Sequence, residues 1–223
     1  MSRKYRSVEV SGKLGSKEKG AKIMTTYLIL GATSLGQLVA QRLVDQQAGT
    51  VRVLHAATDN LSADLASSVN EFSGDLTKEA TYVDALQDAP IIFSALEGMD
   101  VDLAFEALFD AQYHHQLKLT RFVMLSTAGV DHEVTGELAY PGITDVKEYL
   151  NQQRYAAKLV DEAEFPYTIL RPVTLTTEAA KDPQIIKEGE PVLAGVVSQS
   201  TVAQVAVDLL KNGGADYQSL AVC

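Results

Sequence analysis

The chain has 223 residues, of which 46% are hydrophobic and 22% charged, and its formal net charge is −10 at pH 7. This composition excludes a wholly disordered protein, and no apolar run reaches the ~18 residues that cross a bilayer, which excludes a membrane-spanning protein. The single cysteine, Cys223, excludes an internal disulfide framework and a cysteine-rich zinc site. It is typical of a reducing compartment, so we expect a cytoplasmic protein with no membrane partner.

The charge is divided unequally along the chain. Residues 1–23 carry a net charge of +5, and the remaining residues carry −15. The basic segment lacks the apolar stretch of a secretion signal, so we expect residues 1–24 to be a disordered arm and residues 25–223 one folded domain. A functional basic tail is the alternative for the arm. Because phosphate affinity comes from lysine and arginine, the acidic body predicts no nucleic-acid partner.

From Thr25 onward, apolar runs of strand length alternate with segments of helical period. Strands are predicted, in chain order, at residues 26–30, 51–54, just before Gly74, and at 90–94, 121–125, 167–170 and 219–222. The helices predicted between them span residues 35–44, 61–69, 78–87, 101–117, 145–163 and 202–211. This alternation predicts an α/β fold, a doubly wound parallel sheet of Rossmann-like type with right-handed crossovers. Little chain is left for a substrate lobe, which we expect to consist of loops at 130–145 and 173–196.

A glycine-containing turn, Gly31-Ala-Thr-Ser-Leu-Gly36, joins the first predicted strand to the first predicted helix. Gly31 permits a tight turn and Gly36 close packing of helix on strand, while N–H groups at the helix start attract a pyrophosphate. Thr33 replaces the middle glycine of the Gly-x-Gly-x-x-Gly fingerprint, and a hydroxyl of Thr33 or Ser34 could donate to phosphate instead. The turn predicts a nucleotide-binding loop. The alternative is a plain turn in which Thr33 or Ser34 caps the helix.

Four short motifs follow one another in an order found in a known family. They are Leu28-Ile-Leu-Gly-Ala-Thr33, Gly74-Asp75, Leu125-Ser-Thr-Ala-Gly129 and Tyr167-Thr-Ile-Leu-Arg-Pro172. From about Thr25 to Val222 the chain resembles the atypical short-chain dehydrogenase/reductases, in particular the small NmrA-like group that includes flavin and biliverdin-IXβ reductase-type proteins. The resemblance implies an oxidoreductase that uses NADP or NAD.

The resemblance also assigns cofactor contacts by position. It implies that the pyrophosphate lies against Gly31, Thr33, Ser34, Leu35 and Gly36. The adenine would lie beside Asp75 and Leu76, and the adenosine ribose and linker beside Ser94, Ala95 and Leu96. The nicotinamide would lie against Leu125, Ser126 and Thr127, with its carboxamide covered by Pro172 and Val173.

Two segments depart from the family pattern around the cofactor. The group usually spaces its glycines as Gly-x-x-Gly-x-x-Gly, whereas here Ser34 holds the middle place and the last glycine comes one residue early. After the second strand, Val53-Leu-His-Ala-Ala57 has no arginine for a 2′-phosphate and no acid for a ribose diol, which leaves NAD and NADP open. His55 could contact adenine or phosphate, or be a half-buried structural histidine.

The catalytic pair of the family is altered as well. The family uses a tyrosine as acid or base, with a lysine four residues later on the same helix face. Counting back from Arg171-Pro172 places the tyrosine at Tyr149 and the lysine position at Gln153. Glutamine can hydrogen-bond a ribose, but it has no charge with which to lower the tyrosine pKa from its free value of about 10. Tyr149 is therefore either an acid or a substrate-contacting or packing residue, and Ser126 or Thr127 could orient a substrate carbonyl.

Other candidate sites are weaker. The adjacent His114 and His115 diverge by about 100° on a helix, so we expect no metal site there. The trio Asp131-His132-Glu133 could contact substrate or be a solvated loop. The chain has neither the Gly-x-Ser-x-Gly turn of an α/β-hydrolase nor the phosphate-loop lysine of a nucleoside triphosphatase.

The first hypothesis is therefore an NAD(P)-dependent reductase of a small planar or carbonyl substrate, with the degenerate pair Tyr149 and Gln153. The second is a non-catalytic NAD(P)-binding sensor or regulator of the NmrA type, and the third a scaffold that binds neither cofactor nor substrate. We expect a small-molecule partner, and the helices that flank such a sheet allow a homodimer.

Overall fold

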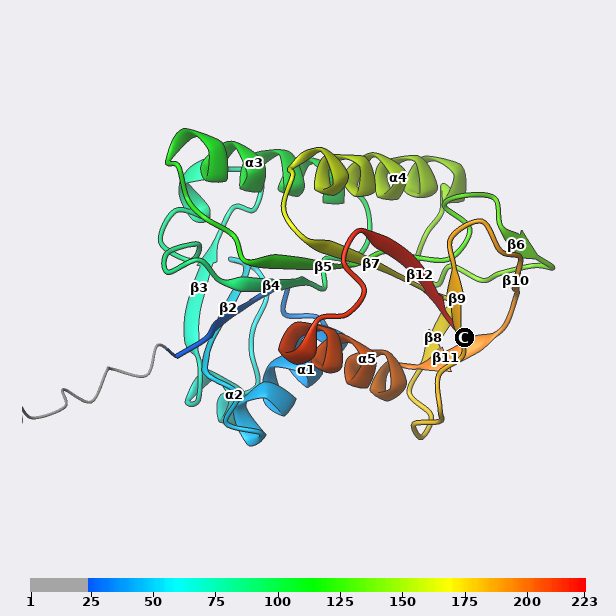
Figure 1. The fold of residues 1–223 in the computed structure, drawn as a ribbon, viewed down its shortest axis with the longest axis horizontal. Helices are drawn as coiled ribbons and strands as arrows, with labels where there is room; N and C mark the ends of the chain where they lie inside the picture. Colours follow the sequence, from blue (N-terminus) through cyan, green and yellow to red (C-terminus); the bar gives the residue numbers. More distant parts are fainter. Residues whose placement is uncertain (1–23) are drawn as a thin grey trace, which may run out of the picture.

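The computed structural model describes residues 24–223, so the arm predicted at residues 1–24 lies, except for its last residue, outside the described part. A sheet of eight strands forms the centre, in the order β3-β2-β1-β4-β5-β7-β12-β9 (Figure 1). Its strands are β1 (Thr26–Leu30), β2 (Thr50–Ala56), β3 (Asn70–Gly74), β4 (Ile91–Ser94), β5 (Arg121–Leu125), β7 (Tyr167–Pro172), β9 (Ile185–Lys187) and β12 (Gln218–Val222).

All neighbouring strands are parallel except the edge pair of β9 and β12. The chain runs outward from β1 to β2 and β3, and then returns to the other side of β1 with β4. The carboxyl ends of β1 and β4 therefore flank the switch point where ligands of such sheets bind. The predicted doubly wound parallel sheet is confirmed.

Four helices cover the two faces of the sheet. Helices α1 (Ser34–Asp45) and α5 (Gln199–Asn212) lie on one face, and α3 (Val101–His114) and α4 (Val146–Glu162) on the other (Figure 1). Within residues 24–223, none combines the length and apolarity that crossing a membrane requires.

Strand β1 is buried on both faces, as its continuous apolar run predicts. Side chains alternate across a strand. Accordingly Ile29 packs into the core on the α1 and α5 face, while Leu28 and Leu30 pack into the core on the α3 and α4 face. The sheet is therefore a rigid support for the loops at its carboxyl edge.

The helix predicted at 78–87 is wrong. Only the 3-10 turn η1 (Glu79–Thr81) and further turns occur there, and the helix predicted at 61–69 shrinks to α2 (Ala63–Ala66). The Tyr82 hydroxyl donates to the carbonyls of Leu76 and Ala104, at 2.7 and 3.0 Å, which holds the segment as turns against α3. Threonine, tyrosine and valine in succession also have low helix propensity.

Besides the edge strand β9, four short strands lie within or at the end of the loops that were expected to form the substrate lobe. Strand β6 (Val134–Thr135) pairs with β10 (Val192–Leu193), and β8 (Thr174–Thr176) pairs with β11 (Val196–Ser198). Each pair joins segments that are far apart in the sequence, so no local sequence pattern predicts the pairing. The two pairs fasten the loops together beyond the carboxyl ends of β5 and β7 (Figure 1).

Candidate functional site

The turn between β1 and α1 requires glycine at both ends. Gly31 has a φ of +97°, and a Cβ atom there would lie 3.1 Å from the carbonyl oxygen of Ala95. A Cβ atom at Gly36 would lie 2.4 Å from the carbonyl oxygen of Gly31, closer than real contacts allow. The Gly31 N–H donates to the Leu54 carbonyl at 2.8 Å, which ties the turn to β2 at the switch point.

Thr33 is the N-cap of α1. Its hydroxyl oxygen accepts from the Gly36 N–H at 3.1 Å and donates to the Ala95 carbonyl at 3.3 Å, so its one hydroxyl proton is engaged within the chain. Of the two residues that the sequence left open as the cap of this helix, Thr33 is the one that caps it, and Ser34 is exposed. The first intrahelical bond runs from the Gln37 N–H to the Thr33 carbonyl, so the N–H groups of Ser34 and Leu35, which come before Gln37, have no acceptor within the helix. Such N–H groups fit a pyrophosphate, because they can donate to its oxygens.

His55 lies at the carboxyl end of β2, with only 3% of its surface exposed. Its Nδ1 contacts the Ala56 carbonyl at 2.8 Å, and its Nε2 contacts a carboxylate oxygen of Glu71 at 2.9 Å. Both ring nitrogens are engaged within the chain, which favours the structural role over a cofactor contact. The glutamate on β3 carried no sequence signal for this pairing.

Asp75 and Leu76 follow β3, as the motif predicts. The Asp75 carboxylate accepts from the Thr77 hydroxyl at 2.7 Å and from the Thr77 N–H at 2.9 Å, and these bonds lower its pKa. Gln37 of α1 is a residue that the sequence reasoning missed. Its amide donates to the Ala32 carbonyl at 2.8 Å and accepts from the Ser62 N–H at 2.9 Å. It thereby ties the loop after β2 to the glycine turn.

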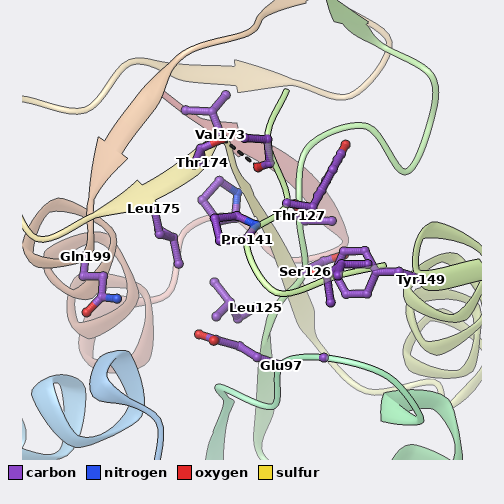
Figure 2. A pocket seen from close by; sticks show the side chains of 15 residues that line it. Glu97, Leu125, Ser126, Thr127, Pro141, Tyr149, Val173, Thr174, Leu175 and Gln199 are labelled. Carbon is purple, nitrogen blue, oxygen red and sulfur yellow. Dashed lines mark hydrogen bonds between the residues drawn. The ribbon is translucent and has the colours of Figure 1, made fainter. Parts of the chain in front are cut away.

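A cavity of about 240 Å³ opens at the carboxyl ends of β5 and β7 (Figure 2). It brings together predicted residues from three segments, namely Leu125, Ser126 and Thr127 at the end of β5, Pro172 and Val173 at the end of β7, and Tyr149 on α4. The sequence reasoning did not single out the cavity residues Glu97, Tyr140 or Gln199. Glu97 belongs to the segment that follows β4, where the resemblance pointed only to the three residues before it.

Tyr149 is 9% exposed, and its ring meets that of Tyr140 edge to face, with centroids 5.9 Å apart. Burial, and next the negative charge of Glu97, raise the pKa of Tyr149 to about 12, although a hydrogen bond with the Thr127 side chain acts in the opposite direction. The phenol is therefore protonated at neutral pH. It can donate a hydrogen bond, but it is a weak acid.

Gln153 lies one helical turn beyond Tyr149 and is 1% exposed. Its Oε1 atom has no hydrogen-bond partner among residues 24–223, and the same is true of the hydroxyls of Ser94 and Ser126. An unpaired buried polar atom costs free energy that a bound ligand can recover. Orphaned hydroxyls at the ends of β4 and β5 fit a ribose and a nicotinamide, the groups that the resemblance places there.

The loop after β5 is held by a buried ion cluster. The Arg171 guanidinium, at the end of β7, pairs with the carboxylates of Glu133 and Asp131, the latter at 3.2 Å. The Glu133 side chain is 6% exposed and also accepts from the N–H groups of Gly129 and Asp131. Glu133 is thus buried in an ion pair, contrary to the solvated-loop alternative, whereas Asp131 and His132 are exposed, as that alternative expects. Elsewhere, His114 and His115 each contact a different carboxylate oxygen of Glu79.

A family model described as NAD(P)H-binding matches residues 31–213. No curated protein sequence matches significantly.

Among solved structures, a Rossmann-fold NAD(P)-binding family protein from Shigella flexneri is 23% identical, with a TM-score of 0.69 over 90% of this chain and 93% of that one. A short-chain dehydrogenase/reductase from Veillonella parvula in complex with NADP is 18% identical, with a TM-score of 0.76 over 90% and 94%. ChuY, an anaerobillin reductase from Escherichia coli O157:H7, is 20% identical, with a TM-score of 0.71 over 89% and 96%. These similarities confirm the predicted fold.

Proposed function

The chain belongs to the NAD(P)H-binding family, and from that premise we propose that it is a reductase that uses NADPH or NADH to reduce a small planar or carbonyl substrate. The observation that carries the proposal is the cavity at the carboxyl ends of β5 and β7. Two of its polar side chains, Ser126 and Thr127, lie at the sheet edge where the resemblance expects the nicotinamide, and Tyr149 of α4 also lines the cavity.

The cofactor would lie along the carboxyl edge of the sheet, where residues from several segments would contact it. The N–H groups at the start of α1 would hold the pyrophosphate, and the segments after β3 and β4 the adenosine. Gln153 would offer its orphaned oxygen to a ribose hydroxyl, in the place of the family lysine. When bound, the dihydronicotinamide supplies the hydride, and the chain supplies binding and orientation.

The cavity residues would act by positioning. Tyr149, protonated because its pKa is about 12, would donate a hydrogen bond to a polar atom of the substrate, and Thr127 holds its phenol in place. Val173 and Leu125 would cover the reacting face and exclude water. Fixing donor and acceptor in one dry site can itself supply a large part of a rate enhancement.

Two measurements in sequence test the proposal. Calorimetric titration with NADH and NADPH should show binding, and each cofactor should raise the melting temperature, because a ligand that prefers the native state stabilises it. Oxidation of the bound cofactor should then follow addition of a flavin, a quinone or an aldehyde. If neither cofactor binds at about millimolar concentration, the reductase proposal fails.

The same measurements distinguish the sensor hypothesis, which Gln153 favours because the family lysine is absent. Tight cofactor binding with no oxidation by any acceptor of the panel would support a sensor. Turnover that is lost in a Thr127→Val, Tyr149→Phe double variant, with cofactor affinity unchanged, would support the reductase.

A further inference from the structure

The cavity holds a single charged side chain among its lining residues. This side chain is Glu97, in the loop that follows β4, and it points its carboxylate into the cavity below Leu125 (Figure 2). Tyr149 lies on the α4 side of the cavity and Gln199 on the α5 side. The other polar groups in the lining are neutral hydroxyls and one amide. No lysine or arginine of the described residues lines the cavity.

The carboxylate therefore sets the sign of the potential inside the cavity. The Glu97 side chain is exposed to solvent through the open cavity. The protein atoms around its carboxyl group still exclude enough water that desolvation raises the pKa of this group. A cation beside it would favour the ionised form and be attracted by it, whereas an anionic substrate would be repelled. The nearby guanidinium of Arg171 offers no compensation, because it is buried against Glu133 and Asp131.

The cavity also lacks an efficient acid for reducing a carbonyl. Hydride addition to a carbonyl carbon leaves negative charge on oxygen, which a neighbouring acid must neutralise. Tyr149 has a pKa of about 12, and Gln153 brings no charge to lower it. An acceptor that is already cationic has no such requirement, because the hydride neutralises it.

We propose that the site prefers a planar cationic acceptor with a C=N⁺ group, an iminium or a related heteroaromatic cation, and that Glu97 determines this preference. The inference rests on the proposed reductase function. In the reaction, the iminium carbon gains the hydride and the C=N π pair becomes the lone pair of a neutral amine nitrogen. The NAD(P)H that gave the hydride is oxidised to NAD(P)⁺, and no proton is consumed.

The test compares two bicyclic acceptors of similar size. N-methyl-dihydroisoquinolinium is a permanent cation with a C=N⁺ bond, and tetralone is a neutral ketone. With the full chain and NADPH or NADH, kcat/KM should be higher for the cation than for tetralone. Glu97→Gln should lower kcat/KM for the cation by about tenfold or more, as loss of one close charge pair implies, and should not lower that for tetralone. Glu97→Asp, which keeps the charge, should retain most of the rate with the cation.

The control is Glu190→Gln, the same chemical change at an exposed residue outside the cavity lining, which should leave both rates unchanged. Melting temperatures establish that each variant is folded. Faster reduction of tetralone by the wild type, or a rate with the cation that does not respond to Glu97→Gln, would overturn the inference and leave the reductase function standing. Absence of cofactor binding would instead overturn the proposed function, and the inference with it.

Discussion

Gln153 occupies the position at which the resemblance expects the family lysine, so under the proposed function it is the residue at which proton transfer can be tested most directly. A lysine ammonium beside Tyr149 would lower the phenol pKa from about 12 toward the neutral range. We expect Gln153→Lys to raise kcat for a neutral ketone such as tetralone by about tenfold or more, since general acid–base catalysis contributes about 10²- to 10⁴-fold. Initial rates across a pH series measure both the gain and the new pKa.

Two further variants show whether the gain at Gln153 comes from the charge. Gln153→Met removes the amide without adding a cation, and it should not raise the rate. Adding Tyr149→Phe to Gln153→Lys should abolish the gain. If the double variant stays as fast as Gln153→Lys alone, the phenol is not the acid.

Glu97 makes the activity with a cationic acceptor depend on pH in a direction set by its carboxylate. Burial raises the Glu97 pKa above the usual value of about 4.3, and below that pKa the carboxylate is neutral. We therefore expect kcat/KM for N-methyl-dihydroisoquinolinium to fall as the pH decreases through the Glu97 pKa. Tyr140 and Tyr149, the other ionisable groups of the cavity lining, have raised pKa values and stay protonated throughout this range.

The matching pH profile of Glu97→Gln should be flat over the acidic range. The acceptor is a permanent cation, so its own charge does not change with pH. A rate that increases as the pH decreases would show that the protonated Glu97 is the active form, and hence that it acts as an acid.

Glu133 stabilises the loop beside the cavity through its ion pair with Arg171. Both side chains are buried, and removing one charge of a buried pair is costly because the other is left uncompensated. We expect Glu133→Gln to lower the free energy of unfolding by about 3 kcal/mol, measured by urea denaturation. Asp131→Asn, at the more exposed partner of the same guanidinium, should cost about 1 kcal/mol or less. Equal losses would mean that burial does not distinguish the two carboxylates.

At the scale of elements, the sequence predicted the parts whose pattern is local. Apolar runs predicted the parallel strands of the sheet, such as 121–125, because a strand that is buried on both faces can be recognised from its own continuous run of apolar residues. The pairs β6 with β10 and β8 with β11 could not be predicted, since each joins short segments far apart in the chain.

The residues of the candidate site likewise include some that the sequence predicted and some that it did not. Ser126 and Val173, at strand ends, were predicted from the family resemblance, and the cavity brings them together because the carboxyl ends of parallel strands meet at one edge of the sheet. Glu97 and Tyr140 were missed because loop geometry brings them to the cavity, and no spacing in the sequence encodes that approach. Glu133 was misread for a related reason, since its partner Arg171 lies on a different strand.

We expect cofactor affinity to depend most on the β1–α1 turn. A methyl group at Gly36 would meet the Gly31 carbonyl at 2.4 Å, so α1 must shift away from the strand end. We expect Gly36→Ala to abolish NADH and NADPH binding in calorimetry and to lower the free energy of unfolding by about 2 kcal/mol. Gly195→Ala is the control, since its nearest atom would be an ordinary 3.9 Å away. Unchanged cofactor affinity in Gly36→Ala would mean that the pyrophosphate lies elsewhere.

For the whole molecule, the distribution of charge works against the binding of an anionic cofactor. Residues after 23 carry a net charge of −15, and the pyrophosphate would be met mainly by backbone N–H groups at the start of α1. The two arginines of the flanking elements are engaged, Arg42 with Ser200 and Arg52 with Asp88. The loop after β2, residues 57–62, contains an aspartate and no basic residue. Long-range repulsion therefore opposes the cofactor, and most of all a cofactor with an additional 2′-phosphate.

Salt should consequently strengthen cofactor binding. The Debye length is about 30 Å at 0.01 M ionic strength and about 8 Å at 0.15 M, so the repulsion of the acidic body is felt at low salt and screened at physiological salt. We expect the Kd of both cofactors, measured by calorimetry, to decrease over this range, and the Kd of NADPH to decrease more than that of NADH. Adenosine, which is uncharged, is the control and should show no such trend. Binding of NADPH that is tighter than that of NADH at low salt and weakens as salt is added would contradict this account, because only a cationic 2′-phosphate site produces that dependence.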